Sequence, residues 1–328
     1  MKYNYLGSTG IRVSSLCMGT MTFGREADKD AAKEIFHQCR NAGINFFDCA
    51  NVYSQGRAER ILGGLIADCR HEVVITSKFG GAFGDDPNNK GGSRRNLVSS
   101  LEASLKRLNT DYLDIYYLHH FDPQTPLEET LRALHDAAAQ GKIRYAGVSN
   151  FAAWQIAKAL GLCALNRWAP IHCIQPMYNL VKRQAEVEIL PLAESEKLAV
   201  VSYNPLGGGL LTGKYGRDRR SAQGRLTGDD MYMKRYGDQW MYEAAANFAQ
   251  LAGENGLHSV TLAVAWAAYH PAVTAPIIGA RSVEQVKDSL QAAEIELSSD
   301  LYEAVCRLTP RPVPATDRTE ILVEDEKA

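Results

Sequence analysis

The feature that most constrains the fold of this chain is a regular alternation of short apolar runs with amphipathic helical stretches along its 328 residues. Most of the runs begin about one βα unit apart. They predict strands at 16–19, 45–48, 73–78, 113–119, 145–149, 173–175, 199–203 and 275–278. Strands that alternate with helices indicate a parallel sheet, and eight of them predict an α/β fold of the (β/α)8 TIM-barrel type.

The intervening segments carry helix signals. Residues 31–43 have apolar side chains at helical spacing, with Asp28 or Asp30 as the candidate N-cap and Gly43 as the stop. Similar patterns predict helices at 57–68, 96–109, 127–141 and 186–197. Each predicted helix begins after a strand and ends near the next.

The chain contains no Pro-, Gly- or Ser-rich linker, so we expect one domain over residues 1–328. Three segments lie outside the alternation. Residues 1–13 predict a hairpin that plugs the barrel floor. Residues 213–240, between strands seven and eight, predict a long polar and aromatic loop, which either orders over a ligand or is simply mobile. The tail at 309–328 is Pro-rich and then acidic, and we expect it to be draped or disordered.

Composition narrows the possible partners. The formal net charge is -2 and the mean hydropathy is -0.25, without an apolar run of membrane-spanning length. These values argue against integral membrane proteins and nucleic-acid binders, so we expect a small-molecule partner. The seven cysteines form no Cys-x-x-Cys pair, which indicates reduced thiols rather than a disulfide framework or a zinc site. The N-terminus has no secretory pattern, which points to the cytoplasm.

Polar side chains stand at the ends of three successive predicted strands. They are Asp48 with Tyr53, Lys78, and His119 with His120. Because active sites of parallel barrels lie at the carboxyl ends of the strands, we expect these groups to meet at one mouth. Adjacent strand residues point to opposite faces, so only one of the two histidines is expected to face the mouth, and no metal site is indicated.

Together these groups are suited to protonating a carbonyl oxygen. A tyrosine titrates normally near 10, and an ammonium beside it lowers that pKa. Lys78 supplies the ammonium, Asp48 holds it as an ion pair, and the imidazole orients the carbonyl. A hydride from a cofactor would complete a reduction. Taken singly, each residue has an ordinary structural explanation, so the inference depends on their conjunction.

Three segments resemble the aldo-keto reductase family: FFDCANVYS, with Asp48, Ala50 and Tyr53; ITSKFG, with Lys78; and DYLDIYYLHH, with His119. The resemblance covers nearly the whole chain. It implies an NADPH-dependent carbonyl reductase with Tyr53 as general acid, tuned by Lys78 and Asp48, and with His119 orienting the substrate.

The resemblance also implies a cofactor site. Expected contacts to NADPH or NADP+ are Gly19, Thr20, Met21, Asp48, Ser149, Asn150, Gln175, Tyr203, Leu206, Gly208, Leu210, Gly213, Lys214, Gly279, Arg281, Gln285, Asp288 and Ser289. Ser149, Asn150 and Gln175 would hold the carboxamide, and Tyr203 would stack on the nicotinamide. The segment from Leu206 to Lys214 would wrap the pyrophosphate, and Arg281 would bind the 2′-phosphate.

Two features qualify these assignments. Gly208 to Lys214 reads G-x-x-x-x-G-K, but Tyr215 follows where a P-loop requires Ser or Thr, so nucleotide triphosphate hydrolysis is not indicated. The glycines also lack Rossmann spacing, so the cofactor would bind without a Rossmann fold. Gly279 and Ser289 stand where many family members have lysine and asparagine, so NADH is an alternative cofactor.

Aromatic residues on the predicted loops are candidates for an apolar substrate pocket around Tyr53 and His119. They are Phe23, Phe83, Phe121, Tyr232 and Trp240. Arg94 and Arg95 would suit a sugar or an anionic substrate. Two other functions stay open: a cofactor-binding regulatory subunit, of the potassium-channel β type that the family also contains, and a Schiff-base aldolase using Lys78.

Overall fold

The computed structural model describes residues 1–216 and 225–320, and a sheet of eight parallel strands forms its centre. The strands are β3 (Cys17–Gly19), β4 (Phe46–Asp48), β5 (Val74–Phe79), β6 (Leu113–Leu118), β7 (Ile143–Ser149), β8 (Ile171–Gln175), β9 (Ala199–Val200) and β10 (Ile277–Ile278). The order in the sheet is β10-β3-β4-β5-β6-β7-β8-β9. The eight predicted strands are therefore confirmed, with boundaries that differ by a few residues.

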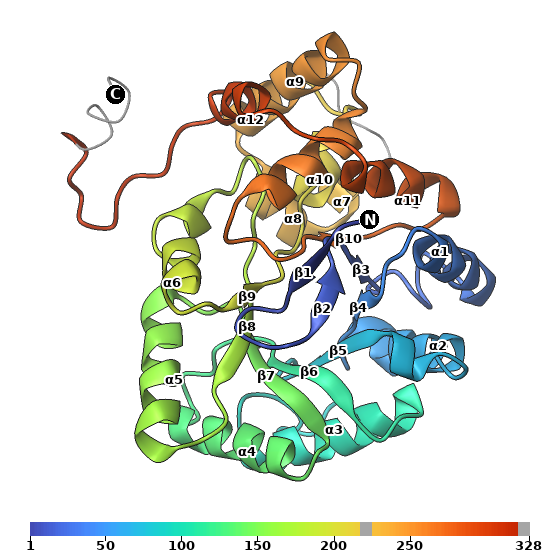
Figure 1. The fold of residues 1–328 in the computed structure, drawn as a ribbon, viewed down its shortest axis with the longest axis vertical. Coiled ribbons are helices and arrows are strands. Elements are labelled where there is room, and N and C mark those ends of the chain that lie inside the picture. The colour runs from blue at the N-terminus through green and yellow to red at the C-terminus, as the bar shows by residue number, and fades with distance from the viewer. Residues whose placement is uncertain (217–224, 321–328) are drawn as a thin grey trace.

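The sheet curls until its two edges meet. Parallel bridges join Val200 to Val273 and Tyr203 to Ile277, which connects the segment of β9 to that of β10. Figure 1 shows the strands around a central axis, with helices outside them. The predicted (β/α)8 barrel is confirmed, and the closing strands are the shortest because only isolated bridges extend them.

Helices cover the outside of the barrel. Those between the strands are α1 (Lys29–Asn41), α2 (Arg57–Leu65), α3 (Arg94–Leu108), α4 (Leu127–Ala139), α5 (Ala153–Asn166) and α6 (Ile189–Ser195). Later helices are α9 (Gln239–Glu254), α10 (Ser259–Tyr269), α11 (Val283–Leu290) and α12 (Ser299–Cys306). The cap of α1 is Asp28, whose carboxylate accepts from the backbone N–H groups of Asp30 and Ala31. Within the described ranges, no helix is both long and apolar enough to cross a bilayer.

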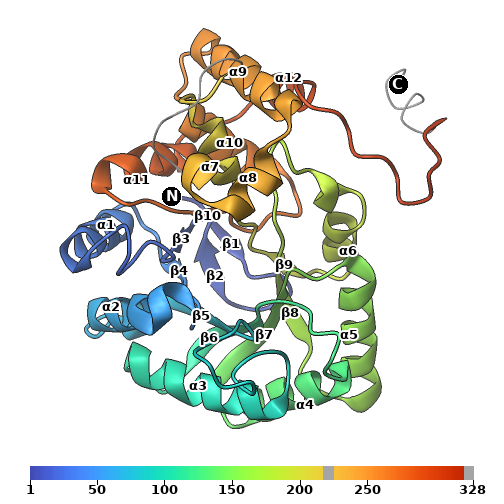
Figure 2. The ribbon, with the colours of Figure 1, turned by 180° about the vertical axis from the view of Figure 1, so that it is seen from behind.

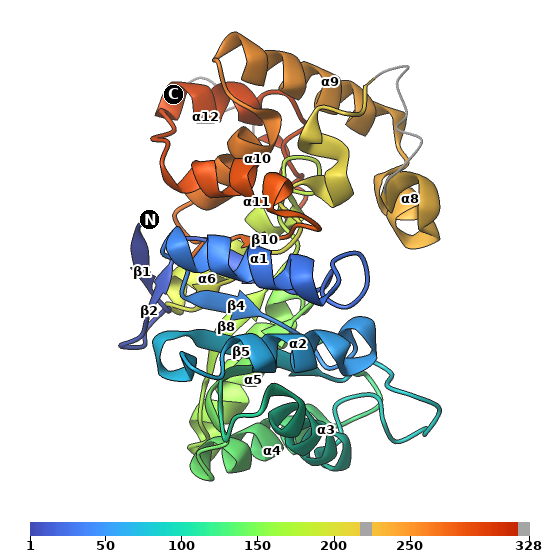
Figure 3. The same ribbon diagram turned by 90° about the vertical axis from the view of Figure 1, so that its right-hand side faces the viewer.

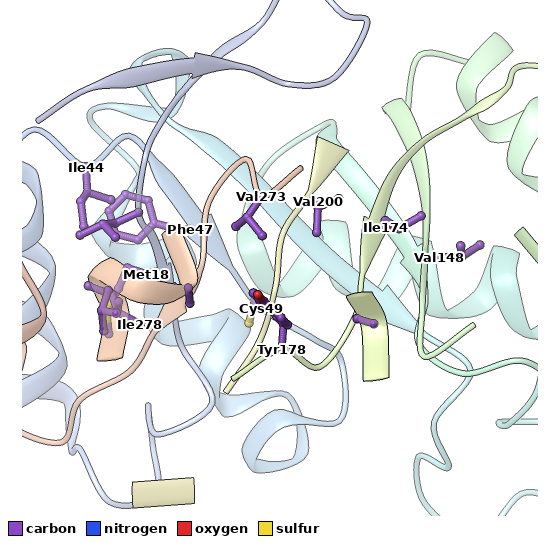
Figure 4. Close-up of a cluster of buried hydrophobic side chains, with 14 of the residues drawn as sticks. Met18, Ile44, Phe47, Cys49, Val148, Ile174, Tyr178, Val200, Val273 and Ile278 are labelled. Atoms are coloured by element: carbon purple, nitrogen blue, oxygen red, sulfur yellow. The ribbon is translucent and has the colours of Figure 1, made fainter. Parts of the chain in front are cut away.

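Strand alternation divides the core into two layers. Side chains that point into the barrel include Cys17, Phe46, Val74, Ile115 and Cys173. Their chain neighbours point outward and pack with the helices. Figure 4 shows part of this outer layer, where Met18, Phe47 and Ile278 meet across β10, β3 and β4.

A hairpin closes the amino-terminal end of the barrel. Strands β1 (Tyr3–Tyr5) and β2 (Arg12–Ser14) pair antiparallel. Leu6 and Val13 are fully buried among the side chains of the barrel interior. Water is thereby excluded from the floor, as the predicted plug requires.

The segment 213–240 contains helices. Residues 217–224 lie outside the described part, and α7 (Arg225–Gly228), α8 (Asp230–Tyr236) and the start of α9 follow. Helix α8 forms because Asp229 caps it by accepting from the N–H groups of Met231 and Tyr232. Figures 2 and 3 show α8 at the opposite end of the barrel from the hairpin. The polar composition led us to expect a loop, and the capped α8 corrects that expectation for these residues.

The described part of the tail, up to residue 320, extends away from the barrel (Figure 1). Thr309 is still buried, and residues 310–318 contain no helix or strand. Residues 321–328, the acidic end of the tail, lie outside the described residues.

A buried ion pair fixes the helices beside β5. The Oε2 atom of Glu59 on α2 lies 2.6 Å from Nε of Arg107 on α3, and the Glu59 side chain is fully buried. Its Oε1 atom accepts a 2.6 Å hydrogen bond from Ser77 on β5. Because Ser77 faces outward, Lys78, the next residue, faces the barrel interior.

We predict that Arg107→Met lowers the free energy of unfolding by about 3 kcal/mol, because it leaves the Glu59 carboxylate buried without its cation. Urea unfolding followed by circular dichroism measures this loss. The double variant Glu59→Gln, Arg107→Met is expected to lose less, since no charge stays buried. A single variant within about 0.5 kcal/mol of the wild type would contradict the prediction.

Candidate active site

The four predicted catalytic side chains come from neighbouring strand ends. Asp48 ends β4, and Tyr53 begins the short 3-10 helix η1 (Tyr53–Gly56). Lys78 is the penultimate residue of β5, and His119 follows β6. Strand alternation turns Asp48 and Lys78 to the same interior side as Phe46 and Val74, so both groups occupy the top of the barrel.

Lys78 is the centre of this group. Its Nζ atom donates to Asp48 Oδ2 at 2.6 Å, to the carbonyl oxygen of Cys49 at 2.8 Å and to Tyr53 Oη at 3.3 Å. The side chains of Lys78 and Asp48 are 0% and 2% exposed. The three donors of the ammonium therefore all have acceptors, which is the condition for burying such a charge.

The second carboxylate oxygen of Asp48 is also held. Its Oδ1 atom accepts from Thr76 Oγ1 at 2.7 Å and from Gln175 Nε2 at 2.9 Å. Thr76 faces the barrel interior two residues before Lys78, and Gln175 ends β8 across the barrel. These bonds fix the orientation of the carboxylate, and with it the position of the ammonium.

Burial and charge act in opposite directions on the pKa values of this group. Burial lowers the pKa of Lys78, but the Asp48 carboxylate and Tyr53 together raise it by more than burial lowers it. The net pKa is therefore raised, and the amine stays protonated. Burial raises the pKa of Tyr53 to about 12, although the ammonium of Lys78 opposes this change. The sequence-based expectation of a lowered tyrosine pKa is therefore wrong for this structure, since desolvation of the half-buried phenol outweighs the ammonium.

His119 is a neutral imidazole at the same mouth. Burial and the charge of Lys78 hold its pKa well below the ordinary value. Its ring lies edge-on to that of Tyr53, with centroids 6.1 Å apart. Among the described residues its buried Nδ1 atom has no hydrogen-bond partner.

The expectation that His119 and His120 point to opposite faces is wrong. Their rings are stacked, with centroids 4.6 Å apart and planes inclined by 5°. Strand β6 ends at Leu118, so the alternation of an extended strand does not apply to the two residues that follow it.

Four polar residues at the ends of β7 to β9 form a chain of hydrogen bonds. Ser149 Oγ donates to the Gln175 carbonyl, and Asn150 Nδ2 donates to Ser149 Oγ. Tyr203 Oη donates to Asn150 Oδ1 at 2.7 Å. Since Gln175 also donates to Asp48, the predicted carboxamide site and the acidic centre share one network.

The predicted pyrophosphate segment is a glycine-rich 3-10 turn, η4 (Gly207–Thr212). Gly208 and Gly209 have φ values of 68° and 101°, and Leu210 is buried beneath the turn. A Cβ atom on Gly208 would come within 2.6 Å of the Tyr232 ring. The half-buried Lys214 follows, and its Nζ atom would lie 3.7 Å from a Cβ on Gly209. The turn thus places the Lys214 ammonium beside backbone that carries no side chains, at Gly208 and Gly209.

The remaining residues near this turn pack at its sides. Leu206 is half-buried before it, and Gly213 ends it with a φ of 79°.

On the other side of the mouth, Thr20 donates through Oγ1 to the Asp48 carbonyl, between Gly19 and the half-buried Met21. A Cβ on Gly19 would come within 2.6 Å of the Ile277 side chain, so this close approach requires glycine.

The predicted adenosine segment surrounds the start of α11. Arg281 is exposed, and its backbone N–H donates to Gln285 Oε1 at 3.2 Å. Asp288 lies 3.6 Å from His258. Ser289 Oγ is buried and has no hydrogen-bond partner in the part of the chain that the structure describes. For residues 1–216 and 225–320, apart from Gly279 itself and its two chain neighbours, no heavy atom lies within 4 Å of a Cβ placed on Gly279.

Of the predicted substrate residues, Tyr53 and His119 meet edge-on, whereas the other aromatic candidates make different contacts. Phe23 is fully buried in the core, because a turn bonds its N–H to the Thr20 carbonyl and directs the ring inward, so it lines no pocket. Tyr232 is almost buried against Gly208, and Trp240 is 39% exposed on α9. Phe83 lies beneath the Arg107 guanidinium, 5.2 Å from it.

Phe121 belongs to a group of aromatic rings that contact one another. Its ring contacts those of Phe151 and Trp154 at 5.3 Å and 6.0 Å. Trp154, near the start of α5, is 61% exposed and was missed from the sequence, since no motif includes it. Arg94 pairs with Asp136 on the neighbouring α4, and Arg95 is exposed.

The seven cysteines are free thiols. Within the described ranges, no three His, Cys, Asp or Glu side chains are grouped so that they could hold a metal ion.

Comparison with known proteins shows the family of this chain. The model of the aldo/keto reductase family matches residues 15–309, and the chain belongs to that family. The uncharacterized oxidoreductase YrpG of Bacillus subtilis is 37% identical over 323 residues, which cover 95% of this chain and 97% of that protein. A probable voltage-gated potassium channel subunit beta of Oryza sativa subsp. japonica is 36% identical over 337 residues, covering 99% of this chain and 98% of the relative. Human aldo-keto reductase family 7 member A3 is 37% identical over 301 residues, which cover 84% of this chain and 88% of that protein.

We predict that His119 makes stability depend on pH. Its pKa is lowered in the folded state, so the unfolded state takes up the proton first as pH falls below about 6.5. The free energy of unfolding is therefore expected to decrease more steeply between pH 7 and 5 for the wild type than for His119→Asn. Urea unfolding at both pH values measures the difference, and equal slopes would contradict a depressed pKa.

Proposed function

We propose that this protein reduces an aldehyde or ketone to the alcohol, reversibly, with NADPH as the hydride donor and Tyr53 as the proton donor. The observation that carries the proposal is the position of the Lys78 ammonium, which bridges the Asp48 carboxylate and the Tyr53 hydroxyl. The neutral imidazole of His119 lies edge-on to the Tyr53 ring, with ring centroids 6.1 Å apart. These groups are suited to placing a proton on a carbonyl oxygen.

The proton path follows from the charges. With its raised pKa, Tyr53 holds its proton at neutral pH and donates it to the substrate oxygen as negative charge develops there. The phenolate left behind is 3.3 Å from Lys78 Nζ, which stabilises it in a site of low dielectric. Asp48 keeps the ammonium charged and in place through the cycle.

His119 orients the substrate oxygen. A buried N–H without an acceptor costs more than a bare ring nitrogen, so the unpartnered Nδ1 favours the tautomer with its proton on Nε2. Nε2 then donates to the carbonyl oxygen beside Tyr53. Because the imidazole is neutral, it polarises the carbonyl and leaves protonation to the phenol.

The residues around this centre fit a nicotinamide cofactor, which when bound supplies the hydride to the carbonyl carbon. Ser149, Asn150 and Gln175 would hold the carboxamide, and Tyr203 would lie beside the ring. The glycine turn with Lys214, flanked by Leu206 and Gly213, would receive the pyrophosphate.

The far end of that cofactor would lie along α11. Arg281 and Gln285 would bind the 2′-phosphate, and Asp288 and Ser289 would contact the adenine. The buried Ser289 hydroxyl, without a partner among described residues, and the open space at Gly279 support this placement. Seven free thiols fit the reducing cytoplasm as the proposed compartment.

The relatives favour one second candidate, a regulatory subunit of the channel β type. The proteins from Oryza sativa and Arabidopsis thaliana named as probable voltage-gated potassium channel subunits beta are 36% and 37% identical to this chain. Steady-state turnover of a panel of aldehydes, sugars, steroids and quinones with NADPH supports the reductase. Tight NADPH binding without turnover supports the regulatory subunit.

A Schiff-base aldolase is disfavoured by the geometry. An amine nucleophile must be neutral and accessible, whereas Lys78 is fully buried, ion-paired and held protonated by Asp48. Borohydride treatment with a carbonyl substrate is expected to leave Lys78 unmodified in a peptide map.

We predict that Tyr53→Phe lowers kcat by at least about a hundredfold, because it removes the proton donor and keeps the ring. The Kd of NADPH, measured by quenching of intrinsic fluorescence, is expected to stay within about twofold, since the hydroxyl is assigned to the substrate side. Tyr5→Phe is the matched control, because Tyr5 is exposed on the hairpin at the far end of the barrel. A Tyr53→Phe enzyme with near wild-type kcat would refute the assigned acid.

We predict that Arg281→Ala weakens NADPH binding by about ten- to a hundredfold, because a guanidinium forms charge-assisted hydrogen bonds with a phosphate. NADH lacks the 2′-phosphate, so its Kd is expected to change little. Fluorescence titration gives both constants, with Arg12→Ala on the hairpin as the control. Equal losses for the two cofactors would show that Arg281 does not read the 2′-phosphate.

A further inference from the structure

The side chain of His119 has an unusual lack of polar support. Its backbone is fixed on both sides, since its N–H donates to the Phe79 carbonyl at 2.8 Å and its carbonyl accepts from Asn150 Nδ2 at 2.9 Å. The buried Nδ1 atom, however, has no partner among the residues the structure describes. Hydrogen bonding through Nδ1 therefore does not set the rotation of the ring about the Cβ–Cγ bond.

Two aromatic rings contact the His119 ring instead. The Tyr53 ring meets His119 at an interplanar angle of 79°, and the His120 ring lies flat against it at 5°. A turn of the His119 ring out of its plane would break the flat contact. The stack also covers one face of His119, while His120 itself stays exposed to solvent.

We propose that His120 is a positioning residue, whose ring holds the His119 imidazole in the plane from which Nε2 reaches the substrate oxygen. This inference rests on the proposed role of His119. His120 is assigned no contact with the reacting atoms and acts only through its neighbour.

The charges at the mouth agree with this role. Burial and Lys78 lower the pKa of both histidines, so two neutral rings stack at neutral pH without repulsion. The proposed role therefore requires a flat aromatic ring at position 120. It does not require the nitrogen atoms of His120. This separates a stacking role from an acid–base role by experiment.

The first test compares His120→Ala with His120→Phe. Alanine removes the ring, and we expect kcat for an aldehyde to fall about tenfold, because the donor loses its fixed direction. Phenylalanine restores a flat ring, and kcat is expected to recover to within about threefold of the wild type. His71→Ala, a substitution of an exposed histidine in η2 (Arg70–Glu72), is the control for loss of an imidazole. The Kd of NADPH is expected to be the same in all of these proteins.

The second test reads His119 directly and does not depend on turnover. In histidine-labelled protein without substrate, long-range 1H–15N spectra report the tautomer, with His119→Asn used for assignment. We expect a single Nε2–H tautomer with sharp signals in the wild type, in His120→Phe and in His71→Ala. In His120→Ala the His119 signals are expected to broaden or to average between tautomers.

Wild-type kcat and unchanged His119 signals in His120→Ala would overturn the proposal. Loss of activity in both His120 variants would also overturn it, since a nitrogen of His120 would then be required. If the wild-type protein turns over no carbonyl compound, the proposed function fails, while the spectra still decide whether His120 holds the ring.

Discussion

The buried ion pair between Lys78 and Asp48 is the interaction on which the rest of the site depends. An ammonium and a carboxylate are buried together only if the remaining hydrogen-bonding capacity of both is satisfied. Here the Cys49 carbonyl and the Tyr53 hydroxyl accept the other two hydrogen bonds of the ammonium. Thr76 and Gln175 donate the other hydrogen bonds that the carboxylate accepts. Two of these four residues, Tyr53 and Gln175, belong to the proposed acid and cofactor sites, so satisfying the pair also places functional groups.

The barrel makes such a pair possible because it gives each strand two different sides. On β5, Lys78 points into the closed barrel and Ser77 points out to Glu59 of the helical layer. The hairpin seals the opposite end through Leu6 and Val13, which keeps water from the interior below the pair. A low dielectric there strengthens the attraction between the charges and also raises the pKa of Tyr53.

That raised pKa has a consequence for the proposed chemistry. Without a positive charge nearby, desolvation alone would make the Tyr53 phenol a poor donor. Lys78 offsets part of this effect, and it stabilises the phenolate only after the proton has left. In the proposed reaction, Lys78 would therefore stabilise the negative charge that develops as Tyr53 gives up its proton.

The eight strands and the convergence of Asp48, Tyr53, Lys78 and His119 could be predicted from the sequence, because strand-end position and alternation are local properties that a barrel converts into proximity. The sequence did not determine how side chains settle where regular structure ends. The stacking of His120 on His119, the burial of Phe23 and the exposed Trp154 beside Phe121 were decided by tertiary packing. The same holds for the net shift of the Tyr53 pKa. Burial and ring contacts depend on residues far apart in the chain. A sequence motif therefore does not predict whether burial or a neighbouring charge has the larger effect on a pKa.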